Sequence, residues 1–466
     1  MIKTHTDSGS LYNVSPGTSG NMNLFITTGR GLEPFLAEEI QELAQEHKLT
    51  ISDGPNEAVA GVSLEAPFET VVALNFGLTT ASRVTWTLLE GYAPNGDAVY
   101  SLTSSIPWEK IFDVEKTFKV EAHCKDGFTT NSMFLALKVK DAIADSFRNK
   151  FGSRPSVDPK NPDVTVLARL QGKKITIAVD TSGETLSNHG YRVGDGRAPL
   201  RENLAASMIR ATGWPLLAKS LRTDCEPVYL ERNAGNAGKE ADSTKRRIPL
   251  RLPVLPTLLD PMCGTGTLPI EAALLLLNKK PNSRRGYFAF DAMACFHGKE
   301  FAEIRSSLSK KFENAELSED AVQGAIKRYT ENLKKNSIDF ECASSPIIAS
   351  DIDAHAITST RRNAEAAGVN KLIDLGRCSF FEGDAPAKCG IMVMNPPYGE
   401  RLEDDEAVAV MYEKIGNTLK HHFRGWMTWL ISNNTPALKR IGLRPTRKVS
   451  LYNGPLACQY QQYILY

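Results

Sequence analysis

The sequence predicts an α/β protein, with a doubly wound, Rossmann-like sheet in its C-terminal half and a smaller α+β part before it. Short apolar runs of strand length alternate with helical stripes along most of the chain. In the C-terminal half, a glycine turn joins a strand that ends near Leu259 to the apolar helix Leu268 to Leu277, which is the first unit of a doubly wound sheet. Further along, the apolar run Ile391-Met392-Val393 leads into two prolines, which cannot donate ladder hydrogen bonds. A buried strand is therefore expected to end there.

Length and composition are those of an ordinary globular protein with two to four domains. The chain has 466 residues, of which 42% are apolar and 23% are charged, and its formal net charge is +1. So small a net charge produces no global field for nucleic acid, and an RNA-binding role would depend on local basic clusters. Each cluster alone is more often a solvated face. The candidates are Arg148 to Arg154, Lys245-Arg246-Arg247, Arg284-Arg285 and Arg444 to Lys448.

The sequence gives no sign of a membrane, metal or disulfide protein. It has no run of about 18 apolar residues, and its first twenty residues are polar, without a basic and then apolar signal. The eight cysteines show no CxxC spacing, so neither a zinc site nor a disulfide framework is indicated. We expect a cytoplasmic protein without a membrane partner or a metal.

In chain order, residues 1–22 are expected to be a flexible tail, because they are rich in Ser, Gly, Thr and Asn. A strand at Leu24-Phe25-Ile26 and a helical stripe from Leu32 to Leu43 then open an α+β unit. Strands and helices alternate from about 58 to 122. A basic helix, Thr130 to Phe151, places Leu135, Val139, Ile143 and Phe147 on one face. A hairpin follows, with strands Val164 to Leu170 and Lys174 to Asp180.

This part of the chain resembles the THUMP module of RNA-modifying enzymes. The similarity lies in Met133 to Pro155, in the hairpin, in Asp180 to Leu186 and in His189-Gly190-Tyr191-Arg192. The segment Ala198 to Ala206 looks like the helix that joins such a module to a methyltransferase domain. The alternative is a structural α+β domain without a ligand. The resemblance implies a ferredoxin-like part at 23–64, a THUMP domain at 65–180, a connecting segment and helix at 181–222 and a methyltransferase domain at 223–466.

The glycine turn reads Asp260-Pro261-Met262-Cys263-Gly264-Thr265-Gly266-Thr267. No Gly-Lys-Ser/Thr closes it, so it is not a phosphate-binding P-loop, and a carboxylate at Asp260 favours a ligand with positive charge. The turn resembles motif I of class I methyltransferases, which use S-adenosylmethionine. That resemblance implies cofactor contacts from Asp260, Pro261, Cys263, Gly264, Gly266 and Thr267, with Cys263 packing rather than acting as a nucleophile.

Two further strand ends carry polar side chains toward the same ligand. The strand Ile347 to Ser350 ends at Asp351-Ile352-Asp353, where a carboxylate can accept both hydroxyls of a ribose. Asp351 is the first choice for that role and Asp353 the second. After the third strand, Leu372 to Leu375, Ser379 occupies the position where the methyltransferases usually carry an acidic residue for the adenine amine, and Asp384 comes five residues later. Ser379, Asp384 or a backbone group remain alternatives for that contact.

The stretch Asn395-Pro396-Pro397-Tyr398 supplies candidate catalytic residues. The residue before a proline has an extended backbone, which fixes the Asn395 carboxamide at the strand tip. A carboxamide oxygen and a carbonyl can accept both hydrogens of an exocyclic amine while an aromatic ring covers the base. For a bare Asn-Pro-Pro, a simple proline turn that closes a strand is the alternative interpretation.

Taken as a set, these motifs resemble the bacterial 23S rRNA guanine-N2-methyltransferases. The resemblance implies a monomeric enzyme that transfers a methyl group to a guanine N2 of 23S rRNA, with RNA as its partner. A tRNA guanine-N2 enzyme, an adenine-N6 methyltransferase and a non-catalytic RNA-binding protein remain alternatives. A carbon-5 pyrimidine methyltransferase would need a cysteine nucleophile, and the motif has Tyr398 there instead. Many members of the family carry a second methyltransferase domain, and this sequence is expected to lack one.

Overall fold

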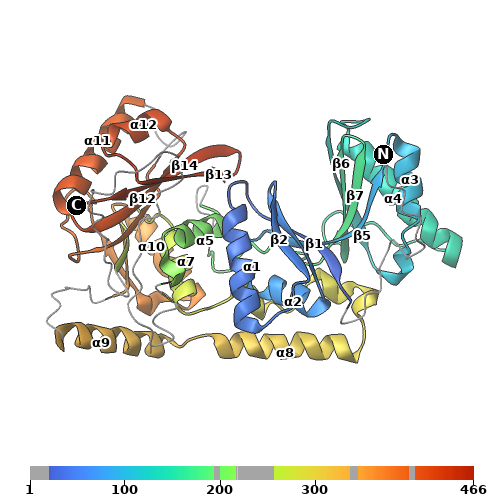
Figure 1. Cartoon of the computed structure of the whole chain (residues 1–466), viewed down its shortest axis with the longest axis horizontal. Coiled ribbons are helices and arrows are strands. Elements are labelled where there is room, and N and C mark those ends of the chain that lie inside the picture. The colour runs from blue at the N-terminus through green and yellow to red at the C-terminus, as the bar shows by residue number, and fades with distance from the viewer. Residues whose placement is uncertain (1–19, 194–199, 217, 219–256, 336–344, 398–404) are drawn as a thin grey trace, which may run out of the picture. The chain divides into compact units, whose positions relative to one another are not determined.

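The computed structural model describes residues 20–193, 200–216, 218, 257–335, 345–397 and 405–466 (Figure 1). The chain divides into two compact units, and neither is a single stretch of sequence. Unit 1 consists of Met1–Thr28, Leu36–Ser187 and Asn282–Glu313. Unit 2 consists of Gly29–Phe35, Asn188–Pro281 and Asn314–Tyr466. Most of the expected tail and the Lys245-Arg246-Arg247 cluster lie outside the described residues.

Unit 1 is built on a seven-stranded sheet with the order β2-β3-β1-β4-β7-β6-β5, in which only β5 and β6 pair in parallel. The predicted hairpin and the strand at 24–26 are confirmed as β7 with β6 and as β1. The strands are β1 (Met22–Thr27), β2 (Asp53–Ala58), β3 (Gly61–Ala66), β4 (Arg83–Tyr92), β5 (Phe118–Lys125), β6 (Val164–Gln171) and β7 (Lys174–Asp180). The helices are α1 (Glu33–His47), α2 (Phe68–Gly77), α3 (Gly96–Ser104) and α4 (Ser132–Phe151).

Helix α4 forms where the apolar stripe predicts it. The side chain of Asn131 accepts a hydrogen bond from the Phe134 amide at its start, and Gly152 ends it with a φ of 73°. The four predicted stripe residues are all buried, whereas Arg148 and Lys150 in its last turn are exposed. The helical period thus decided which face of α4 packs on the sheet.

A segment that the sequence presents as an insertion between two strands of unit 2 belongs to the core of unit 1. Its 3-10 turns and helix α8 (Lys299–Ala315) contribute Phe288, Phe290, Phe296 and Phe312 to that core. The ring of Phe312 stacks on His47 with centroids 4.3 Å apart, and Phe296 lies 4.5 Å from Phe68. No pattern in the sequence predicted that the aromatic residues of this segment complete the core of unit 1.

Unit 2 contains the predicted doubly wound sheet, with the order β10-β9-β8-β11-β12-β14-β13. The five strands β10, β9, β8, β11 and β12 run parallel to one another, and β14 pairs antiparallel with both β12 and β13. The strands are β8 (Thr257–Asp260), β9 (Ile347–Asp351), β10 (Ile373–Arg377), β11 (Gly390–Met394), β12 (Trp426–Ser432), β13 (Arg447–Asn453) and β14 (Leu456–Ile464).

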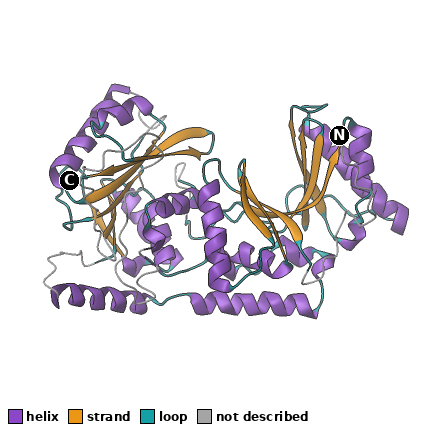
Figure 2. Cartoon of the chain, in the orientation of Figure 1, coloured by secondary structure: helices purple, strands orange, loops and turns teal. Residues whose placement is uncertain are grey.

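Helices cover both faces of this sheet (Figure 2). One apolar core joins it to α5, α7 and α10, and a second joins it to α11 and α12. Within the described ranges, every helix is too short or too polar to cross a bilayer. The helices are α5 (Glu202–Ala211), α7 (Thr267–Leu276), α9 (Glu319–Lys335), α10 (Ala354–Ala367), α11 (Asp405–His422) and α12 (Thr435–Arg440).

We expect Phe312→Ala to lower the free energy of unfolding by about 3–5 kcal/mol, because it leaves a cavity where the ring of α8 packs on the rest of the unit 1 core. Urea denaturation followed by circular dichroism measures the loss. Ser306→Ala, on the exposed side of the same helix, is the control and should change little. Equal stability of the two variants would mean that α8 is not part of the core.

Candidate functional site

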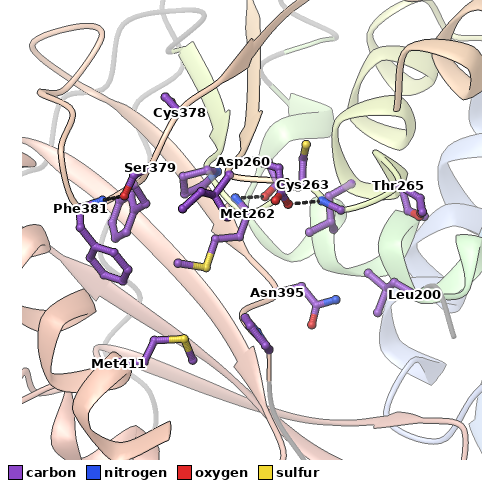
Figure 3. A pocket seen from close by; sticks show the side chains of 18 residues that line it. Leu200, Asp260, Met262, Cys263, Thr265, Cys378, Ser379, Phe381, Asn395 and Met411 are labelled. Carbon is purple, nitrogen blue, oxygen red and sulfur yellow. Dashed lines mark hydrogen bonds between the residues drawn. The ribbon is translucent and has the colours of Figure 1, made fainter. Parts of the chain in front are cut away.

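A pocket of about 320 Å³ lies in unit 2, where the parallel strands β8, β9, β10 and β11 end (Figure 3). Open α/β sheets bind ligands at this edge, next to the point where the strand order reverses, which is here between β8 and β11. The volume is in the range of small-molecule sites. The lining residues are Leu200, Asp260, Pro261, Met262, Cys263, Gly264, Thr265, Thr267, Leu268, Asp351, Ile352, Cys378, Ser379, Phe380, Phe381, Asn395, Pro397 and Met411.

The glycine turn is held in place by helix α10. Gly264 and Gly266 have φ values of +55° and +82°, and a Cβ on Gly266 would lie 2.6 Å from Cγ2 of Thr360. The Thr360 hydroxyl donates to the Gly264 carbonyl at 2.9 Å, and the Asn363 amide donates to the Thr265 carbonyl at 2.9 Å. Both glycines are therefore required by backbone conformation, and the second also by close packing.

Asp260 is a buried carboxyl at the tip of β8. Only 1% of its surface is exposed, and the Met262 amide donates to its Oδ1 at 3.2 Å. Burial, together with the negative charge of Asp351, raises the pKa of Asp260 to about 8. A positively charged group bound in the pocket would favour the ionised form, because an opposite charge stabilises a buried carboxylate.

Asp351, at the tip of β9, is oriented by two backbone amides. Its Oδ2 accepts from Gly264 and its Oδ1 from Asp353, both at 2.9 Å. Asp353 itself caps α10 by accepting from the His355 amide, and it does not line the pocket. Asp351, the first choice for a ribose-binding carboxylate, thus lies in the pocket, whereas Asp353, the second choice, is the N-cap of α10.

The end of β10 contributes Ser379 and two aromatic rings. The Ser379 hydroxyl accepts from the Phe381 amide at 3.3 Å, as Figure 3 shows, and both Phe380 and Phe381 line the pocket. Asp384, in contrast, is 93% exposed and lies 2.9 Å from Nδ1 of His422, outside the pocket lining. The geometry favours Ser379 or a backbone group over Asp384 for a ligand contact here.

Asn395 follows β11 and projects its carboxamide into the pocket, between Met411 and Leu200 (Figure 3). Its Oδ1 is buried, yet it has no hydrogen-bond partner among the described residues. A buried carboxamide oxygen without a partner costs about 1–3 kcal/mol, so such a group is commonly a ligand contact. Pro397 lines the pocket, Pro396 does not, and Tyr398 lies outside the described residues.

The connecting segment is bonded to the first turns of α7. His189 Nδ1 and the Tyr191 hydroxyl lie 2.7 and 2.8 Å from Glu271 Oε1 in a buried cluster. Arg192 donates to Glu202 at 2.6 Å, to the Leu200 carbonyl and, at 3.4 Å, to the Thr267 hydroxyl. Arg192 thereby ties two pocket-lining residues together.

Of the residues proposed from the sequence, most are brought together at one edge. The structure gathers Asp260, Pro261, Cys263, Gly264, Thr267, Asp351, Ile352, Ser379, Asn395 and Pro397 around the pocket, and leaves Gly266, Asp353, Asp384 and Pro396 out of its lining. Their roles stay predictions. Burial raises the pKa of the Cys263 thiol, which fits packing rather than nucleophilic attack.

Sequence reasoning missed Phe380 and Phe381, although they follow a strand end by only a few residues, and it missed Met411 and Leu200, which other elements bring in. The bracing residue Asn363 was also missed. For the two phenylalanines, the rule that strand ends carry ligand contacts was the available signal. For the others, only the folded arrangement reveals the contact.

Family models match three consecutive parts of the chain. Residues 23–85 match the RlmL ferredoxin-like domain, 94–180 the THUMP domain, and 255–462 the RMKL-like methyltransferase domain. By fold and domain content, the chain is therefore a class I methyltransferase domain joined to a ferredoxin-like and THUMP unit. The resemblances to the THUMP module and to class I methyltransferases are confirmed.

The chain's curated homologues are the ribosomal RNA large subunit methyltransferases K/L. It is 31% identical to that of Syntrophotalea carbinolica over 442 residues, and 30% identical to that of Shewanella pealeana over 446 residues. These matches cover 94% and 96% of this chain but 53% of each relative. The chain thus spans about half the length of the curated relatives it matches.

Solved structures support the same fold. The protein SMU.472, described as a methyltransferase and complexed with SAH, is 21% identical with a TM-score of 0.72, and the match covers 96% of this chain and 98% of that one. TrmN from Thermus thermophilus is 17% identical with a TM-score of 0.56, covering 95% and 98%. At these identities the likeness concerns the fold alone.

We expect Asp260→Asn to stabilise the ligand-free protein increasingly as pH rises. The folded-state pKa of about 8 lies above the unfolded value of about 3.9, so the wild type loses stability as pH rises from about 4 through 8, by at most about 1.4 kcal/mol per pH unit. Asparagine keeps the acceptor for Met262 without that penalty. Urea unfolding at pH 5, 6.5, 8 and 9 should give a difference that grows up to pH 8 and then levels off. A difference that is constant with pH would contradict this assignment.

Proposed function

We propose that the protein transfers a methyl group from S-adenosylmethionine to the exocyclic N2 of a guanine in 23S rRNA. The observation that carries the proposal is the buried Oδ1 of Asn395, which has no hydrogen-bond partner in the described part of the chain and lies in the same pocket as the buried Asp260 carboxyl. The Asn395 oxygen can accept a hydrogen bond, and the Asp260 carboxylate can bind a positive charge. An aromatic amine next to a cationic cofactor supplies both.

The lining residues fit S-adenosylmethionine. Asp260 would face its ammonium or sulfonium charge, and Asp351 would accept from the ribose hydroxyls, as acidic residues at this strand do in dinucleotide folds. Ser379, Phe380 and Phe381 offer a polar group and two rings for the adenine. The bound cofactor supplies an electrophilic methyl group, so the protein needs no covalent nucleophile, in keeping with the buried Cys263.

Asn395 and the Pro396 carbonyl would orient the target amine. The extended backbone before Pro396 fixes the carboxamide, which accepts one amine hydrogen and so aims the nitrogen lone pair. These hydrogen bonds strengthen as positive charge develops on the nitrogen, which is the differential binding that accelerates a reaction. Positioning supplies the rest of the rate enhancement, and the proton can leave after transfer without a dedicated base.

Support for ribosomal RNA comes from the relatives, which are named large subunit rRNA methyltransferases, and from the THUMP domain at 94–180. Such a substrate would place the enzyme in the bacterial cytoplasm, and we propose that it acts there as a monomer. A tRNA guanine is the competing substrate.

The test is transfer of labelled methyl groups to purified RNA, followed by mass spectrometry of the nucleosides. We expect N2-methylguanosine in 23S rRNA that lacks the modification, and none in tRNA transcripts. If N2-methylguanosine formed only in tRNA, the substrate would be a tRNA guanine instead. A labelled N6-methyladenosine would reject the guanine assignment.

Asn395→Ala should lower kcat by roughly 100-fold or more, as removal of one preorganised hydrogen-bonding group does elsewhere, while the Kd for S-adenosylmethionine changes less than about threefold. Single-turnover kinetics and isothermal titration measure the two quantities. Met411→Leu, on the pocket wall, conserves volume and should leave both nearly unchanged. Wild-type turnover in Asn395→Ala would remove the carboxamide from the mechanism.

A further inference from the structure

The C-terminal part of unit 2 carries a concentration of positive charge that the proposed reaction does not use. After Glu413 the sequence contains no Asp or Glu, although the whole chain has nearly balanced charges, with 55 Lys and Arg against 54 Asp and Glu. The same stretch contains eight Lys and Arg residues, all exposed. They are Lys414, Lys420, Arg424, Lys439, Arg440, Arg444, Arg447 and Lys448.

Seven of these residues lie in or next to the last turn of α11, the last turn of α12 and the start of β13, and we call them the basic surface: Lys420, Arg424, Lys439, Arg440, Arg444, Arg447 and Lys448. The Nζ of Lys420, in the last turn of α11, lies 3.0 Å from where a Cβ of Gly442 would stand. This places Lys420 beside the end of α12, which carries Lys439 and Arg440. The surface therefore combines residues from α11, α12 and the edge strand β13.

None of the seven forms an ion pair within the part of the chain that the structure describes. Asp384, which precedes β11, is already paired with His422 of α11 at 2.9 Å. The guanidinium of Arg447 lies 5.8 Å from the centre of the Trp429 ring, which orients it without neutralising it. Exposed cations without acidic neighbours produce a local field that attracts polyanions.

Strand order places one part of the basic surface, Lys420 and Arg424, at the edge of the sheet opposite the pocket. Asn395 follows the end of β11, whereas Arg424 precedes the start of the parallel strand β12. Across β14, Arg447 and Lys448 align through Gln462 and Gln461 with Trp429 and Leu430, so they lie level with the middle of β12. The seven residues of β12 span about 20 Å between the two edges.

We propose that the basic surface binds phosphates of the RNA substrate at a second contact, remote from the target guanine. The proposal depends on the proposed function only in taking RNA as the substrate. A partner that contacts both edges must extend over more than about 20 Å, which a folded rRNA segment does and an isolated nucleotide does not. The THUMP domain would then not be the sole source of affinity for RNA.

The composition of the surface favours RNA over a protein partner. Protein interfaces are enriched in aromatic residues, Met and Arg, but their cores are depleted in charged residues as a group, and Lys is underrepresented there. The basic surface is instead a set of exposed Lys and Arg side chains, which neutralise phosphates and release counterions.

The test compares two triple variants of the full chain. Arg440→Glu, Arg444→Glu and Lys448→Glu change the basic surface. Lys327→Glu, Arg328→Glu and Arg361→Glu make the same change of charge on exposed positions of α9 and α10. Filter binding with in vitro transcribed 23S rRNA, from 50 to 300 mM KCl, gives affinity and its salt dependence. Isothermal titration with S-adenosylmethionine monitors the pocket.

We expect the basic-surface variant to bind 23S rRNA at least tenfold more weakly at 100 mM KCl, with a salt slope shallower by about 2 to 3, since each lost phosphate contact removes about 0.7–0.9. The control variant should change affinity less than threefold, and the cofactor Kd should be unchanged in both. If the triple variant does not fold, Arg444→Gln and Lys448→Gln give the same comparison, with a slope loss of about 1 each.

If both triple variants bound RNA equally weakly, the change in net charge alone would explain the loss, and the proposal would be overturned. If the basic-surface variant kept wild-type affinity for RNA, the proposal would also be overturned. If that variant instead lost association with a protein partner, the surface would be a binding site for that partner. A wild-type protein that binds 23S rRNA but not S-adenosylmethionine would refute the proposed function while leaving the second contact in place.

Discussion

The site depends on one backbone constraint, the parallel pairing of β8 with β9 on one side and with β11 on the other. Parallel strands end at the same edge, so this pairing alone brings Asp260, Asp351 and Asn395 together from positions far apart in the sequence. A slip of one residue in any of these strands would turn its side chains to the opposite face. Apolar residues that fill both faces of the sheet fix the register, because β8, β11 and β12 are buried along their whole length.

The pocket holds two groups that are unfavourable in the absence of a ligand: the buried Asp260 carboxyl and the buried Asn395 oxygen, for which the residues that the structure describes supply no hydrogen-bond donor. Each lowers the stability of the ligand-free protein, and in the proposed reaction each would be relieved by a different partner, Asp260 by the cation of the cofactor and Asn395 by the amine of the base. The braces from Thr360 and Asn363 to the glycine turn keep this arrangement from relaxing. The ligand-free protein is thus less stable than it could be, but its polar groups are already in position for a ligand. Such preorganised groups need no rearrangement during a reaction, which lowers the free energy of the transition state.

The sequence predicted much of the fold because local signals and tertiary packing agree there. The stripe of α4, the glycine turn and the apolar strand before Asn395 all form where periodicity and proline placed them. The edge strands β2 and β13 were missed, because both are largely exposed and so lack an apolar pattern. In the site, strand ends pointed to Asp351 and Asn395, whereas Asp384 was an alternative several residues beyond a strand end, in a loop where spacing does not determine position. That side chain lies with His422 instead.

The least predictable feature is the path of the chain between Asp260 and Ile347. After α7 it leaves the sheet of unit 2, places Phe288, Phe290, Phe296 and Phe312 in the core of unit 1, and returns through α9 to form β9. No local pattern encodes this, since an aromatic segment in an insertion is equally compatible with packing on either unit. The consequence is a coupling of the two units through the covalent chain. Pairing β8 with β9 closes a long loop at an entropic cost that grows only slowly with its length. If the core of unit 1 fixes the middle of that loop first, less of this entropy remains to be lost when the cofactor edge of the sheet assembles.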